Sequence, residues 1–365
     1  MKILVISKSF FPIAGPRSSR ATELVKELSR KGNDVTVVAP RKSIVHDQFE
    51  KDFNVKVADL GTHFFSPTDA NNLSFFKKVL LKILMEIGMT EYLNFPDVLY
   101  YFKTKKKLRK YRDYDLVISI AKPHSIHWGV ADALVKDRRI ARKWIADCGD
   151  PFMSNPFRTP AKFFEKHERN FCRIADFITV PVKEAIGSYY PEYRNKIKVI
   201  PQGFDLEKDK RNILSYTPNP ITTFAYAGAF YKDKRDPRKF LEFLLHLNRE
   251  YRFIIYSSNF DLVRPYAEKA DGKIELRNYV PRQKLLGELS KMDFLINVSN
   301  ISSVQSPSKL IDYYIVGRPV LTIENGSVDP IKLNKFLNGN YEDKHKFESV
   351  EKYDIKYVAQ QFLML

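Results

Sequence analysis

The stretch KILVIS at residues 2–7 and the stretch DVTVV at residues 34–38 decide the fold class of this chain. Each is short and rich in β-branched residues, which is typical of strands buried in a parallel sheet. Between them, from residue 18 to residue 30, apolar residues recur at helical spacing, and Gly32 stands where a helix C-cap belongs. This strand–helix–strand pattern predicts the first step of a doubly wound α/β domain.

The same pattern recurs along the chain. Further strands are predicted at 116–120, 143–146, 177–180, 197–200, 222–227, 253–257, 294–298 and 320–323, and helices at about 237–249, about 281–291 and from about 308. A polar stretch, 205–220, separates the two series of strands. We therefore predict an α/β chain of two Rossmann-like domains facing a cleft, with residues 1–204 as the N-terminal domain and residues 205–365 as the C-terminal domain.

Composition excludes several classes of protein. The 365 residues are 44% hydrophobic and 28% charged, which is ordinary for a globular enzyme. Only two cysteines occur, Cys148 and Cys172, without CxxC or zinc spacing, so a secreted disulfide scaffold is excluded and a reducing, cytoplasmic location is expected. The apolar run at the start of the chain is too short for a signal peptide. We also expect no transmembrane span, because such a span needs roughly 20 apolar residues.

Positive charge is concentrated in the first part of the chain. The net charge is +18, and residues 1–200 hold 36 Lys and Arg against 22 Asp and Glu. The densest basic run lies between Lys103 and Arg112, and it follows an aromatic, amphipathic segment that starts near Leu73. This basic insert is either a solvated surface or the binding face for an anionic partner such as a phospholipid surface, a nucleic acid or a phosphorylated substrate.

The common cofactor motifs are missing. Neither G-x-G-x-x-G nor G-x-x-x-x-G-K-[ST] follows a predicted strand, so an NAD enzyme and a P-loop ATPase are not expected. There is no H-E-x-x-H, and the neighbouring His124 and His127 are interpreted as structural residues rather than metal ligands. The sequence also contains no nucleic-acid recognition module, so no nucleic-acid partner is expected.

Two loops of the N-terminal domain hold candidate residues. Gly15 ends the loop after the first strand, where backbone amides at a helix N-terminus can meet an anion. Asp147 and Asp150 follow the strand at 143–146, and ligands of α/β sheets bind beyond the carboxyl ends of the strands. A helix cap is the alternative interpretation of these two aspartates.

The C-terminal domain contributes two further segments. Gly228 ends a predicted strand, and Lys234 and Arg235 precede the next helix, as a diphosphate site requires. In the second segment, Ser308 is placed to cap a helix whose free amides point into the cleft. The other candidates of that segment are Gln305, Lys309 and Asp312.

Taken in order, these segments resemble a bacterial glycosyltransferase of family 4 (group 1) with a GT-B fold. The similar stretches are FFP at 10–12, IAD at 145–147, IPQGFD at 200–205, YAG at 226–228 and PSKL at 307–310. The resemblance implies transfer of a sugar from a nucleotide-diphosphate donor to a hydroxyl acceptor with retention of configuration. It also implies no metal and no cofactor beyond the nucleotide-sugar, which is a co-substrate.

The resemblance also implies roles for the candidate residues. The donor diphosphate would meet Gly228, Lys234 and Arg235, and the helix that opens at Ser308 and Lys309. Asp312 would bind the ribose, Gln305 would lie nearby, and Gly15 would contribute from the facing domain. Asp147 or Asp150 would lie near the sugar and the acceptor hydroxyl as catalytic residues.

One departure from the family leaves two functions open. The family carries two glutamates separated by seven residues; Asp312 matches the second, but Val304 stands at the first. The chain is therefore either a transferase of bacterial surface polysaccharide biosynthesis or a catalytically inactive scaffold that binds sugar nucleotide or glycan. The expected acceptor is a glycan or a lipid-linked molecule. A lipid-linked acceptor would bring the protein to an anionic membrane surface, as a peripheral protein at the inner face.

Overall fold

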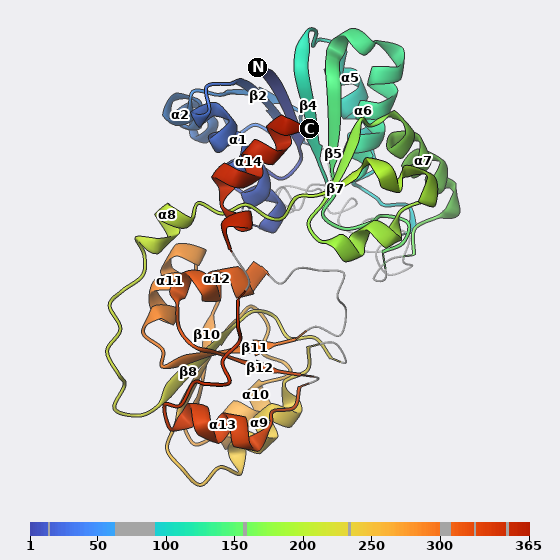
Figure 1. The fold of residues 1–365 in the computed structure, drawn as a ribbon. Coiled ribbons are helices and arrows are strands. Elements are labelled where there is room, and N and C mark those ends of the chain that lie inside the picture. The colour runs from blue at the N-terminus through green and yellow to red at the C-terminus, as the bar shows by residue number, and fades with distance from the viewer. Residues whose placement is uncertain are drawn as a thin grey trace, which may run out of the picture. The chain divides into compact units, whose positions relative to one another are not determined.

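The computed structural model describes residues 1–13, 15–62, 92–155, 159–232, 235–299, 308–324, 326–347 and 350–365. The chain divides into two compact units, and each is described by itself (Figure 1). The first unit comprises 1–203 together with 355–365, and the second comprises 204–354. The C-terminal segment 355–365 thus belongs to the first unit, whereas the sequence analysis assigned it to the C-terminal domain.

A seven-stranded parallel sheet forms the centre of the first unit, in the order β3-β2-β1-β4-β5-β6-β7. Its strands are β1 (Lys2–Ser7), β2 (Asp34–Ala39), β3 (Lys56–Asp59), β4 (Tyr114–Ile120), β5 (Ala141–Asp147), β6 (Phe177–Val180) and β7 (Ile197–Val199). The helices are α1 (Pro16–Arg30), α2 (Ser43–Phe53), α5 (Leu99–Leu108), α6 (Ser125–Lys136), α7 (Glu165–Ile174) and α14 (Ile355–Met364). Short 3₁₀ turns occupy Arg138–Ile140, Lys162–Phe164, Lys183–Ser188 and Pro191–Lys196.

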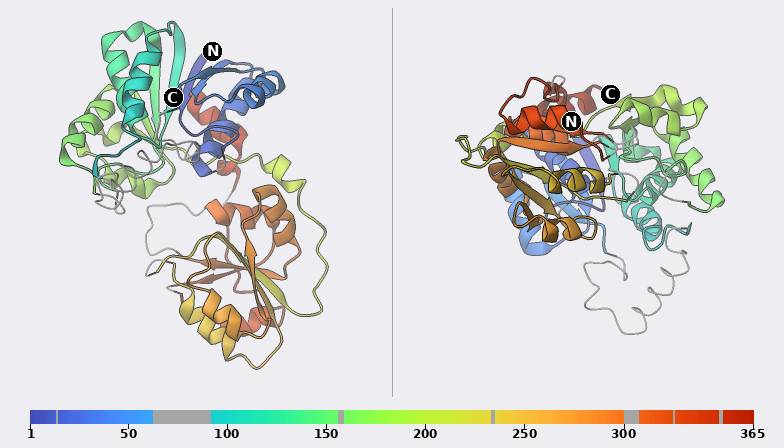
Figure 2. Two further views of the ribbon diagram at one scale, coloured as in Figure 1. Left: turned by 180° about the vertical axis from the view of Figure 1, so that it is seen from behind. Right: turned by 90° about the horizontal axis from the view of Figure 1, so that it is seen from below.

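Helices cover both faces of this sheet, as two views of the ribbon show (Figure 2). On one face, α1, α2 and α14 share a single buried core with β1 and β2. On the other, α5 packs closely on α6: a side chain at Gly129 would overlap the Tyr101 carbonyl and Thr104. α6 packs in turn on α7. Because both faces of the sheet are covered, the strands are nearly continuous runs of apolar residues.

Helix α14 returns to the first unit because its apolar residues complete that unit's core. Val358 and Phe362 are 1% exposed and belong to the same cluster as the buried face of α1. Gly203, the last residue before the second unit, lies so close to α14 that any side chain there would overlap Ile355. Burial of these apolar side chains therefore explains why residues 355–365 belong to the first unit.

The second unit contains a five-stranded parallel sheet in the order β10-β9-β8-β11-β12. Its strands are β8 (Thr223–Ala227), β9 (Arg252–Ser257), β10 (Ile274–Asn278), β11 (Phe294–Val298) and β12 (Val320–Ile323). Its helices are α8 (Leu206–Lys210), α9 (Arg238–Leu245), α10 (Arg264–Lys269), α11 (Arg282–Ser290), α12 (Ser308–Val316) and α13 (Pro330–Leu337), with a 3₁₀ turn at Glu351–Tyr353. One core contains α9 and α13, and another contains α11 and α12, so the sheet is covered on both faces.

The predicted α/β class with two Rossmann-like units is confirmed by these two sheets. Every strand predicted from the sequence is present, with ends that differ by at most two residues, while β3 and β10 were not predicted. Of the basic insert, which starts near Leu73, the part up to residue 91 lies outside the described residues. The rest leads into α5 and includes the turn after it.

Candidate functional site

The order of strands points to one crevice in each unit. In open α/β sheets, ligands bind beyond the carboxyl ends of the strands, at the point where the strand order reverses. That point lies between β1 and β4 in the first unit and between β8 and β11 in the second. Gly15 lies in the loop after β1, and Gly228 and Arg235 lie in the loop after β8. Lys309 comes after β11, in the first turn of α12.

In the second unit, Gly228 stands at this switch point, directly after β8. Its φ of +145° lies in the region that favours glycine, and a Cβ there would come within 3.1 Å of the Tyr226 hydroxyl oxygen. That hydroxyl donates a hydrogen bond to the Ala229 carbonyl at 3.1 Å. The chain therefore turns tightly here and presents bare backbone, which a ligand can approach closely.

Two cations meet beside this turn. The Arg235 guanidinium donates to the Ala229 carbonyl at 3.3 Å. Lys309, in the first turn of α12, donates to the Val298 carbonyl at 3.2 Å, and its Nζ lies 4.6 Å from the centre of the Tyr226 ring. Burial, together with the charge of Arg235, holds the pKa of Lys309 well below its ordinary value. An anion bound here would relieve this unfavourable electrostatic environment.

Asp312 lies one turn beyond Lys309 on α12 and is held by an arginine that the sequence analysis missed. Arg282, at the start of α11, contacts Asp312 at 2.7 Å and also Asp209 at 2.7 Å. Burial raises the pKa of Asp312 above its ordinary value, although the Arg282 charge opposes that rise. Arg282 could not be found from local spacing because its partners lie 30 and 73 residues away.

Three of the predicted donor-binding positions are not fully described. Lys234 and Gln305 lie outside the described residues, as does Val304. Ser308 begins α12, but its side chain also lies outside them. The structure thus brings together Gly228, Arg235 and Lys309.

In the first unit, Asp147 is held in a buried ion pair with Arg20. Its side chain is completely buried, and both carboxylate oxygens accept hydrogen bonds from Arg20 of α1 at 2.6 Å. The Thr179 hydroxyl donates a third bond at 2.6 Å. Burial disfavours the charge of Asp147, yet the Arg20 charge and these bonds hold its pKa below the ordinary value. These contacts are those of a structural ion pair, and the catalytic role of Asp147 stays a prediction.

Asp150 is the more accessible of the two predicted carboxylates. Its side chain is 22% exposed and contacts Lys122, in the loop after β4, at 3.1 Å. The backbone carbonyl of Asp150 is bonded to His124 Nε2 at 2.9 Å. Asp150 thus lies beyond the carboxyl end of β5, where an acceptor hydroxyl could approach it.

The two neighbouring histidines are buried members of the same framework. His127 Nδ1 is bonded to the Ser119 hydroxyl at 2.7 Å, and burial lowers the pKa of His127 to about 4. Burial likewise lowers the pKa of His124 well below its ordinary value. Burial thus disfavours the charged form of both rings. Among the described residues, no group of His, Cys, Asp and Glu is arranged to hold a metal.

Gly15 immediately precedes α1, with a φ of +145°. The first turn of this helix has no acidic residue and no side-chain cap. Its amide groups are therefore open to an anion at the carboxyl end of β1.

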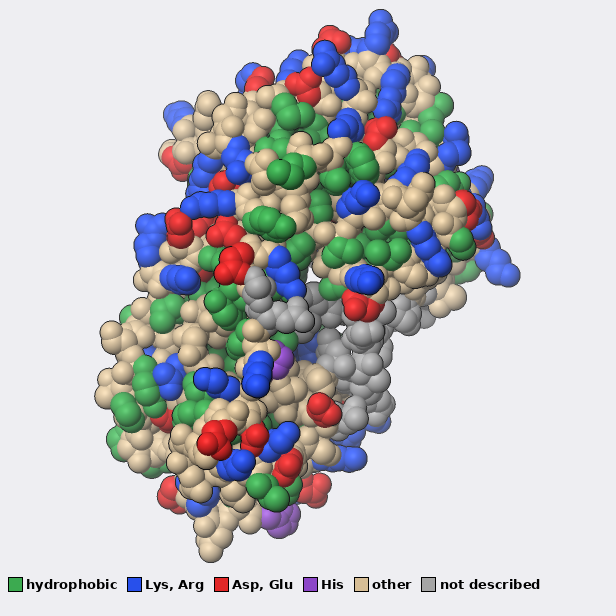
Figure 3. All heavy atoms as spheres, in the orientation of Figure 1, with side chains coloured by type: hydrophobic (Ala, Val, Ile, Leu, Met, Phe, Trp, Pro, Cys, Tyr) green, Lys and Arg blue, Asp and Glu red, His purple; other side chains and the backbone are tan. Residues whose placement is uncertain are grey.

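The basic run predicted from the sequence occupies α5 and the turn after it. Figure 3 shows Lys and Arg side chains spread over the visible face of the first unit. A pocket of about 210 Å³ lies where α5 and α6 end, at the amino ends of β4 and β5. It is lined by Lys105, Arg109, Arg112, Asp132, Ala133, Lys136, Asp137 and Ile140. This basic surface is thus at the opposite end of the sheet from the crevice.

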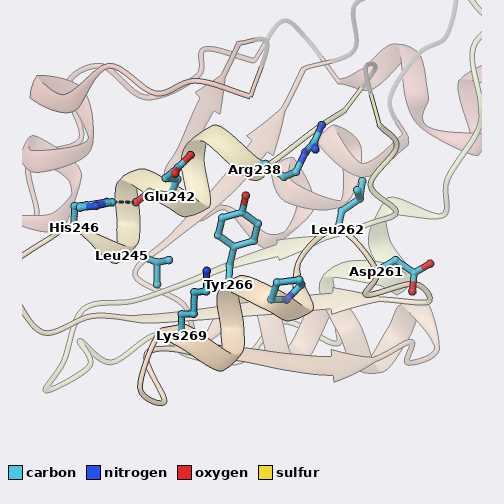
Figure 4. A pocket seen from close by; sticks show the side chains of 9 residues that line it. Arg238, Glu242, Leu245, His246, Asp261, Leu262, Tyr266 and Lys269 are labelled. Carbon is cyan, nitrogen blue, oxygen red and sulfur yellow. Dashed lines mark hydrogen bonds between the residues drawn. The ribbon is translucent and has the colours of Figure 1, made fainter.

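A second pocket, of about 580 Å³, lies between α9 and α10 in the second unit (Figure 4). The Tyr266 hydroxyl points between Glu242 and Arg238. Two acidic and two basic side chains balance each other in its lining, and none of the predicted site residues takes part. The pocket is therefore separate from the predicted donor site.

Comparison with known proteins shows the fold. No family model and no curated protein matches the chain. Similar solved structures include Anabaena HepE in complex with UDP and glucose (TM-score 0.61, 11% identity, 100% of this chain and 98% of that one). Others are a glycosyltransferase of Rickettsia africae (0.61, 11%, 100% and 97%) and the lipopolysaccharide outer core galactosyltransferase WaaB (0.59, 12%, 100% and 98%).

These likenesses confirm the predicted GT-B class of two-domain α/β fold. The same fold is also found in UDP-GlcNAc 2-epimerase of Neisseria meningitidis bound to UDP-GlcNAc (TM-score 0.55, 13% identity, 100% and 99% covered). The reaction must therefore be argued from the residues of this chain. Within the described ranges, no helix combines the length and the apolar character that crossing a bilayer demands.

Proposed function

We propose that this protein is a glycosyltransferase that moves a sugar from a nucleotide-diphosphate donor to a hydroxyl acceptor. The observation that supports this most strongly is the meeting of Gly228, Arg235 and Lys309 at the β8/β11 crevice. HepE, which shares the fold, is known with UDP and with UDP-glucose. A bare turn beside two cations has the shape and charge that a nucleoside diphosphate requires.

In the proposed reaction, the bond between the sugar C1 and the diphosphate oxygen breaks as the acceptor oxygen bonds to C1. Arg235, Lys309 and the amides that open α12 would stabilise the charge that develops on the departing diphosphate. That diphosphate would accept the proton of the acceptor hydroxyl, which gives retention of configuration without a separate strong base. Asp150 would orient the acceptor, and Asp312 would bind the ribose.

Three further parts of the proposal concern the setting. We propose a hexosyl donor, a glycan or lipid-linked acceptor and a role in bacterial surface polysaccharide biosynthesis. A lipid-linked acceptor would place the protein at an anionic membrane surface, and the exposed cations of α5 would supply peripheral binding there. Phe102 and Lys106 of α5 are exposed, as is Arg109 directly after the helix.

A second candidate is a scaffold that binds sugar nucleotide or glycan without turnover. It is favoured by Val304, which stands where the resembled family has its first glutamate. The retained Arg235 and Lys309 argue for binding and do not by themselves require turnover.

Incubation with UDP-, GDP- and ADP-sugars tests these candidates directly. A transferase should release nucleoside diphosphate from one donor, and NMR of the sugar product should show the donor's anomeric configuration. A scaffold would bind a donor without consuming it, and an epimerase would return a nucleotide-sugar of altered sugar configuration. Arg235→Gln should abolish release, whereas Lys239→Gln, which removes an exposed charge from the same region, should not.

A further inference from the structure

The pocket between α9 and α10 in the second unit is lined by side chains that the proposed reaction does not use (Figure 4). Its volume of about 580 Å³ lies in the range of small-molecule sites. α9 supplies Arg238, Glu242 and His246, and α10 supplies Tyr266 and Lys269. Residues three and four apart share one face of a helix, so each helix presents a stripe of side chains to the pocket.

The floor of this pocket is apolar. Leu245, Leu262 and Tyr266 pack against the core of the second unit and are only half-buried, so part of each side chain faces the pocket. Pro265 also lines it. The flat ring of a tyrosine beside aliphatic side chains suits a ligand that has an apolar face of its own.

Polar groups with unused hydrogen-bonding capacity surround this floor. The Tyr266 hydroxyl points between Glu242 and Arg238 (Figure 4). Within the part of the chain that the structure describes, that hydroxyl and the carboxylates of Glu242 and Asp261 make no hydrogen bond. Carboxylates only accept, whereas a tyrosine hydroxyl both donates and accepts. A ligand that satisfies them must therefore bring several donors, as the hydroxyl groups of a sugar do.

The charge of the lining disfavours an anionic ligand. Nε of Arg238 donates to both carboxylate oxygens of Asp236 at 2.9 Å, so the positive charge of this arginine is already balanced. The remaining charged groups of the lining are Glu242, Asp261 and Lys269. Two carboxylates against one ammonium would repel a phosphate, and the ammonium in turn opposes a cation. A neutral ligand fits best.

We propose that the pocket between α9 and α10 is a saccharide-binding site, which holds a neutral sugar ring against Tyr266 while Glu242 and Asp261 accept its hydroxyl groups. This site is separate from the predicted donor site and does not depend on the proposed reaction. A transferase and a scaffold could both use it to hold a glycan chain, because a second point of attachment raises the overall affinity for a long ligand.

The test uses four free neutral sugars as probes: glucose, galactose, mannose and N-acetylglucosamine. Saturation-transfer difference NMR with the full chain measures their binding, and at least one should bind. Tyr266→Ala should weaken that binding by roughly tenfold or more, since both the stacking ring and its hydroxyl are lost. Glu242→Gln and Tyr266→Phe should each weaken it by about threefold or more through a lost or weakened hydrogen bond.

Two matched controls lie in the same unit, outside the pocket. Tyr279→Ala removes a tyrosine that is 67% exposed, and Glu268→Gln neutralises an exposed carboxylate of α10. Both should bind the sugar like the wild type. Circular dichroism establishes which variants are folded. Should Tyr266→Ala not fold, Glu242→Gln decides the matter, because Glu242 is exposed and contributes no core packing.

Two charged analogues and UDP complete the design. Glucuronate and glucosamine carry a charge on the same kind of ring and should bind more weakly than the neutral sugar. Excess UDP should leave sugar binding unchanged, because the two sites are separate. Tighter binding of either charged analogue would overturn the assignment to a neutral sugar. Displacement of the sugar by UDP would give the signal to the donor site and overturn the proposal.

The proposal would also be overturned if none of the four sugars bound the wild type at tens of millimolar. Wild-type affinity in folded Glu242→Gln and Tyr266→Phe would likewise refute it. Failure of the protein to bind any nucleoside diphosphate would refute the proposed function instead. Sugar binding that depends on Tyr266 and Glu242 would then still stand, so the two failures are distinguishable.

Discussion

Two aspartates of the predicted site, Asp147 and Asp312, each contact an arginine, with opposite consequences for protonation. Asp147 lies wholly inside the first unit, and its pKa is held below the ordinary value, with Arg20 opposing the effect of burial. Asp312 keeps a raised pKa, since burial outweighs the single contact with Arg282. The first is therefore a structural anion, while the second is poised to respond to a ligand or to pH.

Asp147→Asn should destabilise the first unit by about 3–5 kcal/mol, because it leaves Arg20 buried without its counter-charge. Urea unfolding followed by the fluorescence of Trp128 and Trp144 measures this, since both tryptophans lie in that unit. The exposed pair of Asp34 and Lys56, 3.7 Å apart, offers a control: Asp34→Asn should change stability by less than about 1 kcal/mol. Equal effects of the two substitutions would contradict the structural role.

The pH dependence of this pair follows from the lowered pKa of Asp147. Its contribution is fully present above the ordinary Asp pKa of about 3.9 and is lost as the pH falls through the lower, folded-state pKa. Asp147→Asn should therefore flatten the acid side of the stability curve of the first unit.

Arg282→Gln should make nucleotide binding more sensitive to acid. If the ionised carboxylate of Asp312 accepts the ribose hydroxyls, affinity falls as the pH drops through its raised pKa. Without the positive charge of Arg282, that pKa rises further, so the loss should begin about one pH unit or more higher. UDP affinity measured from pH 5 to pH 8 shows this shift, and Asp312→Asn should show no such step. An unshifted profile in Arg282→Gln would leave Arg282 a purely structural residue.

At the scale of elements, the sequence predicts those strands that a local run of apolar residues marks. The runs 2–7, 177–180, 294–298 and 320–323 are central or well-buried strands, and their predicted ends agree with the structure. The missed strands β3 and β10 are short and carry charged residues, so no continuous apolar run marks them in the sequence.

Tertiary contacts explain the remaining differences from the sequence-based predictions. The sequence could place Gly228, Arg235 and Lys309 at one end of the sheet because each lies between the carboxyl end of a strand and the first turn of the next helix. The burial of Asp147 could not, because Arg20 lies 127 residues away in sequence. The return of α14 was missed for the same reason, since residues 204–354 separate it from the core that it joins.

Phe362→Ala tests the placement of α14. Phe362 is 1% exposed in the first unit's core, so truncation should cost about 3–5 kcal/mol in that unit. Tyr357, which is 50% exposed on the same helix, supplies the control, and Tyr357→Ala should stay within about 0.5 kcal/mol. Tryptophan fluorescence during urea unfolding is again the measurement. A small effect of Phe362→Ala on stability would contradict the placement of α14 in this core.

At the scale of the whole molecule, charge and site occupy different ends of the first sheet. The cations of α5 lie toward the amino ends of the strands, and the crevice lies at the carboxyl ends. Lys105 is paired with Asp132 at 2.8 Å and Arg112 with Asp137 at 2.7 Å, so the uncompensated charge of the run comes from its other cations. A surface of this kind could bind a membrane without blocking the crevice.

Replacement of Lys105, Lys106, Lys107 and Lys110 by Glu should release the protein from anionic liposomes and leave UDP binding intact. Each cation near such a surface contributes about 1 kcal/mol, so raised salt should weaken the wild-type binding. The charge-matched control replaces the exposed Lys239, Lys269, Lys284 and Lys332 of the second unit by Glu. Cosedimentation measures the effect, and equal wild-type binding to neutral and anionic liposomes would rule out the membrane proposal.

The central claim is that the β8/β11 crevice binds the diphosphate of a nucleotide-sugar. Its most direct test is the affinity of the full chain for UDP, GDP and ADP, with Arg235→Gln and Lys239→Gln compared in parallel. One nucleotide should bind and, at a hundred times its Kd, stabilise the fold by about 2.7 kcal/mol. Arg235→Gln should lose tenfold or more of that affinity, while Lys239→Gln retains it. Absence of binding by all three nucleotides, or equal affinity in the wild type and Arg235→Gln, would contradict the claim.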